Sequence, residues 1–404
     1  MRIAVLCTDQ GVRIPGEKGA SLHLQSLAKA FTAIGHQVLL IGVEGHGKRP
    51  GFCTTLLLPH PGRADGLLRE QNKLAITERF VDVAGPALDD FAPDIIYERL
   101  ALFGTAGMRL AKRIAARHVI EVNALLAKEE AEWREFSLVE TAMQRENEVL
   151  RTADCVVAVS AEWAQQVSAI RTDGGGHDPA VHVVPNGFDE DVFQERFDKR
   201  SARIEFGLPA EARVVLFSGA LRPWHGLDTA ISSLEGLPSN VVLVVAGDGE
   251  IRLHLQRRAE NLGVAHRIMW LGHVAHPMMP RLLAAADVGV APYPDLSGFA
   301  FSPLKLYEYL AAGLPIVASR IGQVHELLSG VASAVLSEPG DPVDLARAIR
   351  LVIENPTYAS AAKGSRLDAF AQHGWQSRAR QIIDIIDAQS ATSLAGKGVR
   401  NVLR

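Results

Sequence analysis

Short apolar runs alternate with helical patterns along almost the whole chain. The first run, Arg2–Cys7, precedes a stretch in which apolar residues recur at helical spacing from Leu24 to Phe31, and Gln37–Val43 is the next run. Ser21 is expected to cap the intervening helix. Strands that are buried on both faces read as continuous apolar runs, and their alternation with helices is typical of parallel doubly wound sheets. The chain is therefore predicted to have an α/β fold.

The alternation occurs in two series, and 404 residues are too many for one ordinary core, so we expect two domains. Charged residues dominate from Glu190 to Arg203, which favours a hinge between the series. We expect one domain over residues 1–190 and another over 191–373, with a final helix at about 374–390 that packs back on the first. The other expected strands are Ile95–Tyr97, His118–Val122, Cys155–Val159, Val181–Val184, Val214–Phe217, Val241–Ala246, Ile268–Leu271, Val288–Ala291, Ile316–Ala318 and Ala334–Leu336.

Charge and cysteine content exclude several function classes. A formal net charge of -4 gives no electrostatic case for binding nucleic acid. Cys7, Cys53 and Cys155 are too few and too scattered for a disulfide framework or a zinc site. The start of the chain turns polar too soon for a secretory signal, and no apolar run approaches the length of a membrane span. We expect a cytoplasmic protein, for which a peripheral membrane contact stays open.

The segment Phe301–Ser319 carries the strongest chemical signal. Ser302 suits an N-cap and Pro303 the first helical position, so the helix start should offer free N–H groups to an anion. Lys305 adds a positive charge, and Glu308 lies on the same face and can accept hydrogen bonds from sugar hydroxyls. The pattern indicates a site for a ribose diphosphate. The alternative is a solvated ion pair on an ordinary helix.

Ligands of open α/β sheets bind at the carboxyl ends of the strands, so the loops that follow the expected strands are candidate sites. In the second series Arg222 lies in such a loop between Gly219 and Gly226, where a guanidinium could hold a pyrophosphate bidentately. An exposed loop with a surface arginine is the alternative. The other candidate loops are Thr8–Ala20, the residue Asn123, Gly247–Gly249, Gly272–Val274 and Pro292–Asp295.

The order of these motifs resembles the retaining GT-B glycosyltransferases of family 4, from the first strand to Ala346. Val184–Gly187 resembles the interdomain strand of that family, and Lys18–His23 resembles its N-terminal glycine loop. The more specific motifs lie in the second half: Gly219, Arg222, His225-Gly226, Gly247–Gly249, Gly272, Val274, Ala286-Asp287, Ser302–Ser319, Gly322 and Glu326.

The resemblance implies two Rossmann-like domains, the second holding a nucleotide diphosphate sugar and the first an acceptor. Arg222 and Lys305 would neutralise the diphosphate and Glu308 would bind the ribose, without a metal or another cofactor. His23, Glu121 and Asn123 would face the acceptor or the transferred sugar, although a helix-surface role for His23 stays open. The donor site would also include Gly19, Gly219, His225, Gly247, His273, Val274, Phe301, Ser302, Pro303 and Leu304.

Three positions depart from the family pattern. Ala300 stands where many members carry a first glutamate, which moves sugar recognition to the backbone between Ser297 and Phe301 and to the opposing domain. His225 replaces a common lysine, and its charge state stays open because histidine titrates near neutrality. Asn123 replaces a common histidine and cannot act as a base, but it can hydrogen-bond a sugar.

The implied reaction is the transfer of a sugar, with retention, to a hydroxyl of a small-molecule, lipid or glycan acceptor. Such a step belongs to glycoconjugate, polysaccharide or natural-product biosynthesis. Family frequency favours a UDP-sugar as donor, with GDP-mannose second. The rivals are a GT-B epimerase or phosphorylase, and a non-catalytic protein that binds a nucleotide sugar. The sequence gives no sign of the oligomeric state.

Other charged or histidine-containing segments have plainer interpretations. Asp189–Asp191 matches an Asp-x-Asp metal motif, but its place in the hinge favours a solvated charge run. Lys128–Glu132 carries paired carboxylates that are expected to face solvent from a helix, although an acceptor-site role stays open. His276 is expected to be a loop residue, and Gly174–His177 a mobile loop.

Overall fold

The structure is a computed structural model that describes residues 1–133, 135–172, 180–296 and 298–400. Two of the expectations above, those for Gly174–His177 and for Ser297, lie outside the described residues. The chain forms two compact units, and neither is one continuous segment. Unit 1 consists of Met1–Asn186, Ala300–Ser302 and Trp375–Arg404, and unit 2 of Gly187–Phe299 and Pro303–Gly374.

Unit 1 contains a parallel sheet, which has eight strands within the described residues. Its order is β2-β3-β1-β5-β6-β7-β8, and β4 pairs with β3. The strands are β1 (Arg2–Leu6), β2 (Arg13–Ile14), β3 (Gln37–Glu44), β4 (Thr54–Leu58), β5 (Ile95–Arg99), β6 (Arg117–Val122), β7 (Cys155–Ala158) and β8 (Val181–Val183).

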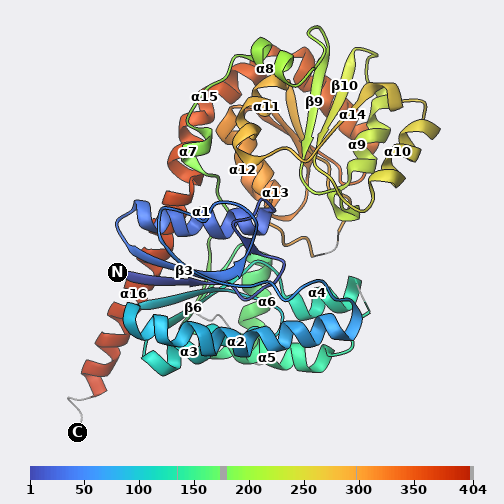
Figure 1. Ribbon diagram of the computed structural model, residues 1–404. Coiled ribbons are helices and arrows are strands. Elements are labelled where there is room, and N and C mark those ends of the chain that lie inside the picture. Colours follow the sequence, from blue (N-terminus) through green and yellow to red (C-terminus); the bar gives the residue numbers. More distant parts are fainter. Residues whose placement is uncertain (134, 173–179, 297, 401–404) are drawn as a thin grey trace. The chain divides into compact units, whose positions relative to one another are not determined.

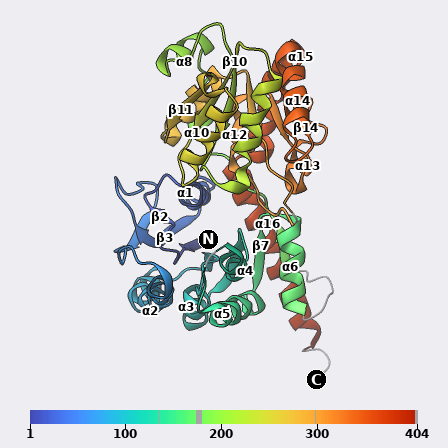
Figure 2. The same ribbon diagram turned by 90° about the vertical axis from the view of Figure 1, so that its right-hand side faces the viewer.

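Helices cover both faces of this sheet. One face packs on α2 and α3 through a core that includes Leu6, Phe80 and Leu110, and farther along on α5 and α6. Figures 1 and 2 show α1 on the opposite face, and α16 packs against α1 although the two helices are far apart in sequence. The helices of unit 1 are α1 (Gly19–Ala33), α2 (Gly66–Phe91), α3 (Ala106–Ile114), α4 (Leu126–Trp133), α5 (Val139–Thr152), α6 (Ala161–Thr172) and α16 (Trp375–Arg400).

Unit 2 contains a second parallel sheet, with the order β11-β10-β9-β12-β13-β14. Helices α9, α10 and α14 share a core with one face, and on the other face α12 contacts both α11 and α15. The strands are β9 (Arg213–Ser218), β10 (Val241–Ala246), β11 (Ile268–Gly272), β12 (Val288–Ala291), β13 (Ile316–Ser319) and β14 (Ala334–Ser337). The helices are α7 (Glu190–Phe193), α8 (Lys199–Glu205), α9 (Leu227–Ser233), α10 (Arg252–Asn261), α11 (Met279–Ala285), α12 (Leu304–Ala312), α13 (Gly322–Leu328), α14 (Pro342–Glu354) and α15 (Pro356–His373).

The strand order reverses direction at β9 and β12 in unit 2, and at β1 and β5 in unit 1. Loops that leave neighbouring strands on opposite sides of a sheet open a crevice at such a point, where ligands of α/β proteins bind. The reversal in unit 2 therefore places the loop Ser218–Gly226 and the approach to α12 at one crevice edge.

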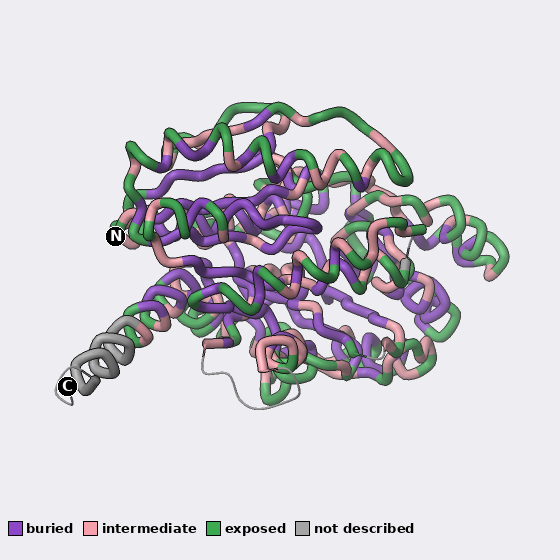
Figure 3. Tube along the Cα trace, turned by 90° about the horizontal axis from the view of Figure 1, so that it is seen from below, coloured by how far each residue is buried: buried purple, intermediate pink, exposed green. Residues whose placement is uncertain are grey.

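The expected α/β fold is confirmed, and every expected strand is present within a residue or two of its expected ends. The sequence analysis missed β2 and β4, which lie at the same edge of the first sheet as β3. β2 has only two residues, and β4 is half-buried along most of its length, so neither shows a long apolar run. As Figure 3 shows, the strands are mostly buried while the outer faces of the helices are exposed.

Some local features differ from the expected ones because tertiary contacts override the local sequence pattern. Ser21 lies inside α1, where its Oγ accepts a hydrogen bond from the Arg13 N–H at 3.1 Å, and it does not cap the helix. Residues 190–203, the expected hinge, contain α7 and most of α8, and the units divide a few residues earlier, between Asn186 and Gly187. Asp189 caps α7 by accepting from the Asp191 N–H. The final helix extends from Trp375 to Arg400.

Within the described residues, no helix has both the length and the apolar character needed to cross a bilayer.

Candidate functional site

The amine of Lys305 lies at the sheet reversal of unit 2. Its Nζ is 4.0 Å from the ring centre of Phe217 and 5.6 Å from that of Tyr293. Only 8% of Lys305 is exposed, and in the part of the chain that the structure describes its Nζ has no hydrogen-bond partner. Burial lowers the pKa of Lys305 to about 7, against the opposing charge of Glu308. A buried, unpartnered ammonium is costly unless an anion binds it, so this position is a strong candidate for an anion site.

Two glycines hold the ends of β9 and β10 close together beside Lys305. Gly219 (φ 134°) and Gly247 (φ 147°) adopt conformations that other residues rarely reach. A Cβ on Gly247 would lie 1.9 Å from the Gly219 carbonyl oxygen, and a Cβ on Gly219 would lie 3.2 Å from the Lys305 Nζ. The glycines therefore leave the backbone around the amine open to a ligand.

His225 and Arg222 occupy the loop that follows β9. The His225 Nδ1 lies 2.5 Å from the Ala220 carbonyl oxygen, which can only accept, so Nδ1 carries the proton. Burial, followed by the positive charge of Lys305, lowers the pKa of His225 to about 3. The imidazole is therefore neutral at physiological pH. Arg222 is half-exposed and pairs with Glu250 at 2.6 Å, a weak surface contact that a phosphate could replace.

Glu308, on the second turn of α12, forms a contact that sequence reasoning missed. Its Oε1 lies 3.1 Å from the Nε2 of His276, and both side chains are 13% exposed. His276 begins a short 3-10 turn, His276–Met278, four residues after the end of β11. His276 thus lies in the connection between β11 and α11, as expected, but its contact with Glu308 was not predicted. No local pattern in the sequence reveals this pairing, because the two residues lie on separate elements.

The start of α12 differs from its expected form. The helix begins at Leu304 with Pro303 as its N-cap residue, so Ser302 does not cap it. The Ser302 Oγ instead accepts a hydrogen bond from the Asn186 N–H, and the Ser302 carbonyl accepts one from the Asn186 amide. Ser302 and Phe301 belong to unit 1, as Gly19 does, whereas the other residues of the expected donor site belong to unit 2. Asn186, from the Val184–Gly187 motif, is thus a positioning residue that the sequence analysis did not single out.

Unit 1 brings the three expected acceptor-side residues together. Glu121, at the end of β6, lies 2.7 Å from the His23 Nε2, and the Asn123 amide donates to the same carboxylate. Tyr97 and Arg99 of β5 also donate to Glu121, at 2.7 and 3.3 Å. Burial alone would raise the pKa of Glu121, but its charged and hydrogen-bonding partners, led by His23, hold it at about 2. The carboxylate therefore stays ionised and orients these side chains.

Other expected site residues are placed less specifically. Gly19 is the first residue of α1 and is exposed, as is His273 after β11. Val274 and Leu304 are half-buried. Glu130, expected to face solvent, instead forms two hydrogen bonds with Arg69, at 2.7 and 3.0 Å. The expectation for that carboxylate was wrong, because Arg69 of α2 binds both of its oxygens.

The two halves of the chain match two glycosyltransferase domain models. The model described as "Glycosyl transferase 4-like domain" matches residues 18–187, and "Glycosyl transferases group 1" matches residues 198–367. The chain belongs to the GT-B glycosyltransferases of family 4. The enzyme is 28% identical to the D-inositol 3-phosphate glycosyltransferase of Xylanimonas cellulosilytica over 308 residues, which are 72% of this chain and 71% of that relative. A protein of the same name from Mycobacterium bovis is 31% identical over 242 residues, 57% of this chain but only 47% of its own length.

Solved structures agree on the fold of this glycosyltransferase. The sucrose-phosphate synthase of Thermosynechococcus elongatus superposes with a TM-score of 0.77 at 21% identity, over 97% of this chain and 100% of its own. HepE of Anabaena, solved in complex with UDP and glucose, superposes with a TM-score of 0.72 at 22% identity, over 96% of this chain and 100% of its own. These likenesses confirm the GT-B fold that the motif order implied.

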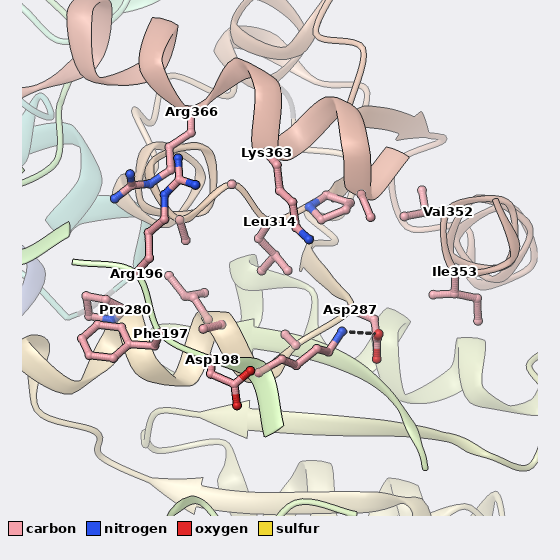
Figure 4. Close-up of a pocket in the computed structure, with 18 of the residues that line it drawn as sticks. Arg196, Phe197, Asp198, Pro280, Asp287, Leu314, Val352, Ile353, Lys363 and Arg366 are labelled. Atoms are coloured by element: carbon pink, nitrogen blue, oxygen red, sulfur yellow. Dashed lines mark hydrogen bonds and ion pairs between the residues drawn. The ribbon is translucent and has the colours of Figure 1, made fainter. Parts of the chain in front are cut away.

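A pocket of about 760 Å³ lies elsewhere in unit 2 of the glycosyltransferase, where the sheet strands begin (Figure 4). Its floor includes Asp287, which pairs with Lys199 at 2.5 Å and with Arg203 at 2.8 Å. Asp287 also accepts a hydrogen bond from the Val214 N–H, which ties the start of β9 to β12. Of the described residues that line this pocket, none belongs to the expected donor site. The charge network here is therefore structural.

Proposed function

We propose that this glycosyltransferase moves a sugar from a nucleotide diphosphate sugar to a hydroxyl acceptor, with retention of configuration. A UDP-sugar is the preferred donor and GDP-mannose the second choice. The observation that carries the proposal is the buried Lys305 amine, which lies at the sheet reversal of unit 2 beside Gly219 and has no hydrogen-bond partner among the described residues. A diphosphate would provide the negatively charged partner that this buried ammonium needs. HepE, which shares the fold, was solved with UDP and with UDP-glucose, and this supports a UDP-sugar.

Each donor-side residue has a role in this proposal. Cleavage of the sugar–phosphate bond leaves negative charge on the diphosphate, and preorganised cations and N–H groups stabilise that charge. Lys305, Arg222 and the N–H groups at the start of α12 provide this stabilisation without a metal. Glu308 accepts hydrogen bonds from the ribose. His225 is neutral in the free enzyme, and its Nδ1–H is bound to Ala220, so it shapes the loop rather than adding charge.

The Glu121 cluster of unit 1 takes the acceptor side. Its carboxylate orients His23 and Asn123, which then offer polar groups to the hydroxyls of an acceptor or of the transferred sugar. No residue of the cluster needs to act as a base under retention. The departing phosphate oxygen accepts the proton of the attacking hydroxyl on the same face of the sugar. The inositol phosphate named in the relatives supports a small, polyhydroxylated acceptor.

Donor screening tests the proposal directly. Thermal shift with nucleoside diphosphates and their sugars should give the largest rise in melting temperature with a uridine compound, because ligands that bind only the folded state stabilise it. With that donor and a polyol acceptor, the enzyme should release nucleoside diphosphate, and only slowly when acceptor is omitted. NMR of the product should show the donor's anomeric configuration, and EDTA should leave turnover unchanged. A non-catalytic binder would release no nucleotide, and an epimerase would yield an altered sugar without an acceptor.

The pKa of Lys305 makes donor binding pH-dependent. Below pH 7 the amine is charged in the free enzyme, whereas above pH 7 it must take up a proton to bind a diphosphate. His225 stays neutral throughout this range. The KM for donor should therefore be nearly constant from pH 6 to 7 and rise by up to about tenfold per pH unit above that. Initial rates at pH 6–9 measure this, and a KM that stays flat to pH 9 would contradict it.

A further inference from the structure

His276 approaches Glu308 in a geometry that settles which group donates. A carboxylate can only accept hydrogen bonds, so the His276 Nε2 at 3.1 Å must carry a proton. Only one carboxylate oxygen takes part in this contact. Among the residues that the structure describes, none forms a hydrogen bond or ion pair with the Glu308 Oε2, and the side chain is 13% exposed. The pair thus combines a held carboxylate oxygen with a second one that can receive a ligand.

The imidazole is itself held in place. Its ring meets the ring of Phe193 edge-on, with centres 6.2 Å apart, and Phe193 is 1% exposed. Phe193 packs in turn edge-on against Phe188, at 5.8 Å. Pro277 directly follows and restricts the backbone of the turn. His276 therefore connects the aromatic cluster of Phe188 and Phe193 to Glu308 of α12.

A free glutamate side chain samples many rotamers, and binding a ligand would have to freeze them. A hydrogen bond from the His276 N–H to one carboxylate oxygen restricts these rotamers before the ligand binds. It thereby removes much of the entropic cost and fixes the direction of the other oxygen. A vicinal diol, such as the two hydroxyls of a ribose, offers two donors that a carboxylate of fixed orientation can accept together.

We propose that His276 is a positioning residue that orients Glu308 and thereby sets the preference for ribose over deoxyribose in the bound nucleotide. The inference rests on the proposed donor site, in which Glu308 receives the ribose. His276 itself need not touch the ligand. It acts through the carboxylate, so its effect depends on Glu308 being present.

The test compares binding of UDP and GDP with their 2′-deoxy and 3′-deoxy forms, by calorimetry on the full-length enzyme. The wild type should bind the ribose form at least about tenfold more tightly, since a hydrogen bond to a charged group is worth that much. His276→Ala should reduce this preference to within about threefold, whereas His276→Gln, which keeps an N–H donor, should restore much of it. The double variant His276→Ala/Glu308→Ala should show the same preference for ribose over deoxyribose as Glu308→Ala alone.

The matched control is His254→Ala, which removes an exposed histidine from α10 and should leave binding unchanged. His276→Ala that keeps the wild-type preference for ribose overturns the inference, even if the variant melts earlier. Losses that add in the double variant also overturn it, because they would show His276 acting without Glu308. If the wild type binds none of the nucleotides, the donor-site proposal fails as well, so the two failures are distinguishable.

Discussion

Replacing Lys305 with methionine should abolish most turnover while making the protein more stable. The loss in kcat/KM should be about 10²–10³-fold, the effect of removing one preorganised charge-stabilising group from an active site. The gain in stability arises because the native state holds an amine that burial disfavours in its charged form, with a pKa of about 7 in place of 10.5. A methionine of similar length fills the space between Phe217 and Tyr293 without that cost, which is worth about 2–4 kcal/mol near pH 7.

The pH dependence of this gain has a definite sign. Between about pH 7 and 10.5 the unfolded chain keeps the Lys305 proton that the native state has lost, so wild-type stability rises with pH across that window. The advantage of Lys305→Met should therefore shrink from pH 7 towards pH 10. Melting temperatures at several pH values, beside donor kinetics, measure both effects. Lys112→Met, at an exposed position of α3, is the matched control and should change neither. An inactive Lys305→Met that is also less stable would show that the amine has a partner in the fold.

Gly247→Ala should destabilise unit 2 by more than about 3 kcal/mol, the scale at which backbone strain and overpacking combine. The new Cβ would lie 1.9 Å from the Gly219 carbonyl oxygen and 2.8 Å from its carbonyl carbon. Both atoms are backbone, and β9 and β10 are paired along their whole length, so neither can move aside cheaply. Urea unfolding followed by tryptophan fluorescence measures the change.

Gly263→Ala is the control for this substitution. Gly263 also has a positive φ, of 68°, but a Cβ there would meet no atom within 4 Å. That variant should lose only about 1–2 kcal/mol, the cost of the left-handed conformation by itself. The difference between the two variants isolates the contact between the strand ends. Equal losses would mean that the strand ends relax apart and that close packing beside Lys305 is not required.

The sequence alone predicts the central strands well because burial on both faces leaves an unmistakable apolar run. Edge elements lack that signal, and β2 is missed for this reason. Helix starts are predicted less well. Ser302 has the side chain of a good N-cap, yet it is used by Asn186, more than a hundred residues away in sequence. Ser21 is diverted in the same way by Arg13. A rule based on neighbouring residues cannot predict a competing hydrogen bond from a residue that is distant in sequence.

The candidate site shows the same division. The sequence predicts that Lys305 and Glu308 lie on one face of the same helix, because their spacing along the chain is a local property. The burial of Lys305 could not be predicted, since it depends on Phe217 of β9 and on Tyr293 in the loop after β12. The contact of His276 with Glu308 could not be predicted either, because the two residues lie on separate elements. On the acceptor side, Glu121 was expected, but its convergence with residues of β5 needed the register of β5 and β6.

The return of α16 to unit 1 constrains how the protein can be made. Trp375, Ala379 and Ile382 of α16 are buried, and the helix packs on α1, which carries His23. On the ribosome, the first 186 residues emerge long before this helix, and the whole of unit 2 is synthesised in between. Until α16 is synthesised, the surface of α1 on which it packs stays exposed to solvent. An intermediate with such an exposed apolar surface is prone to aggregate. A recombination event at a single junction would likewise deliver an incomplete unit 1, because α16 follows the whole of unit 2 in the sequence.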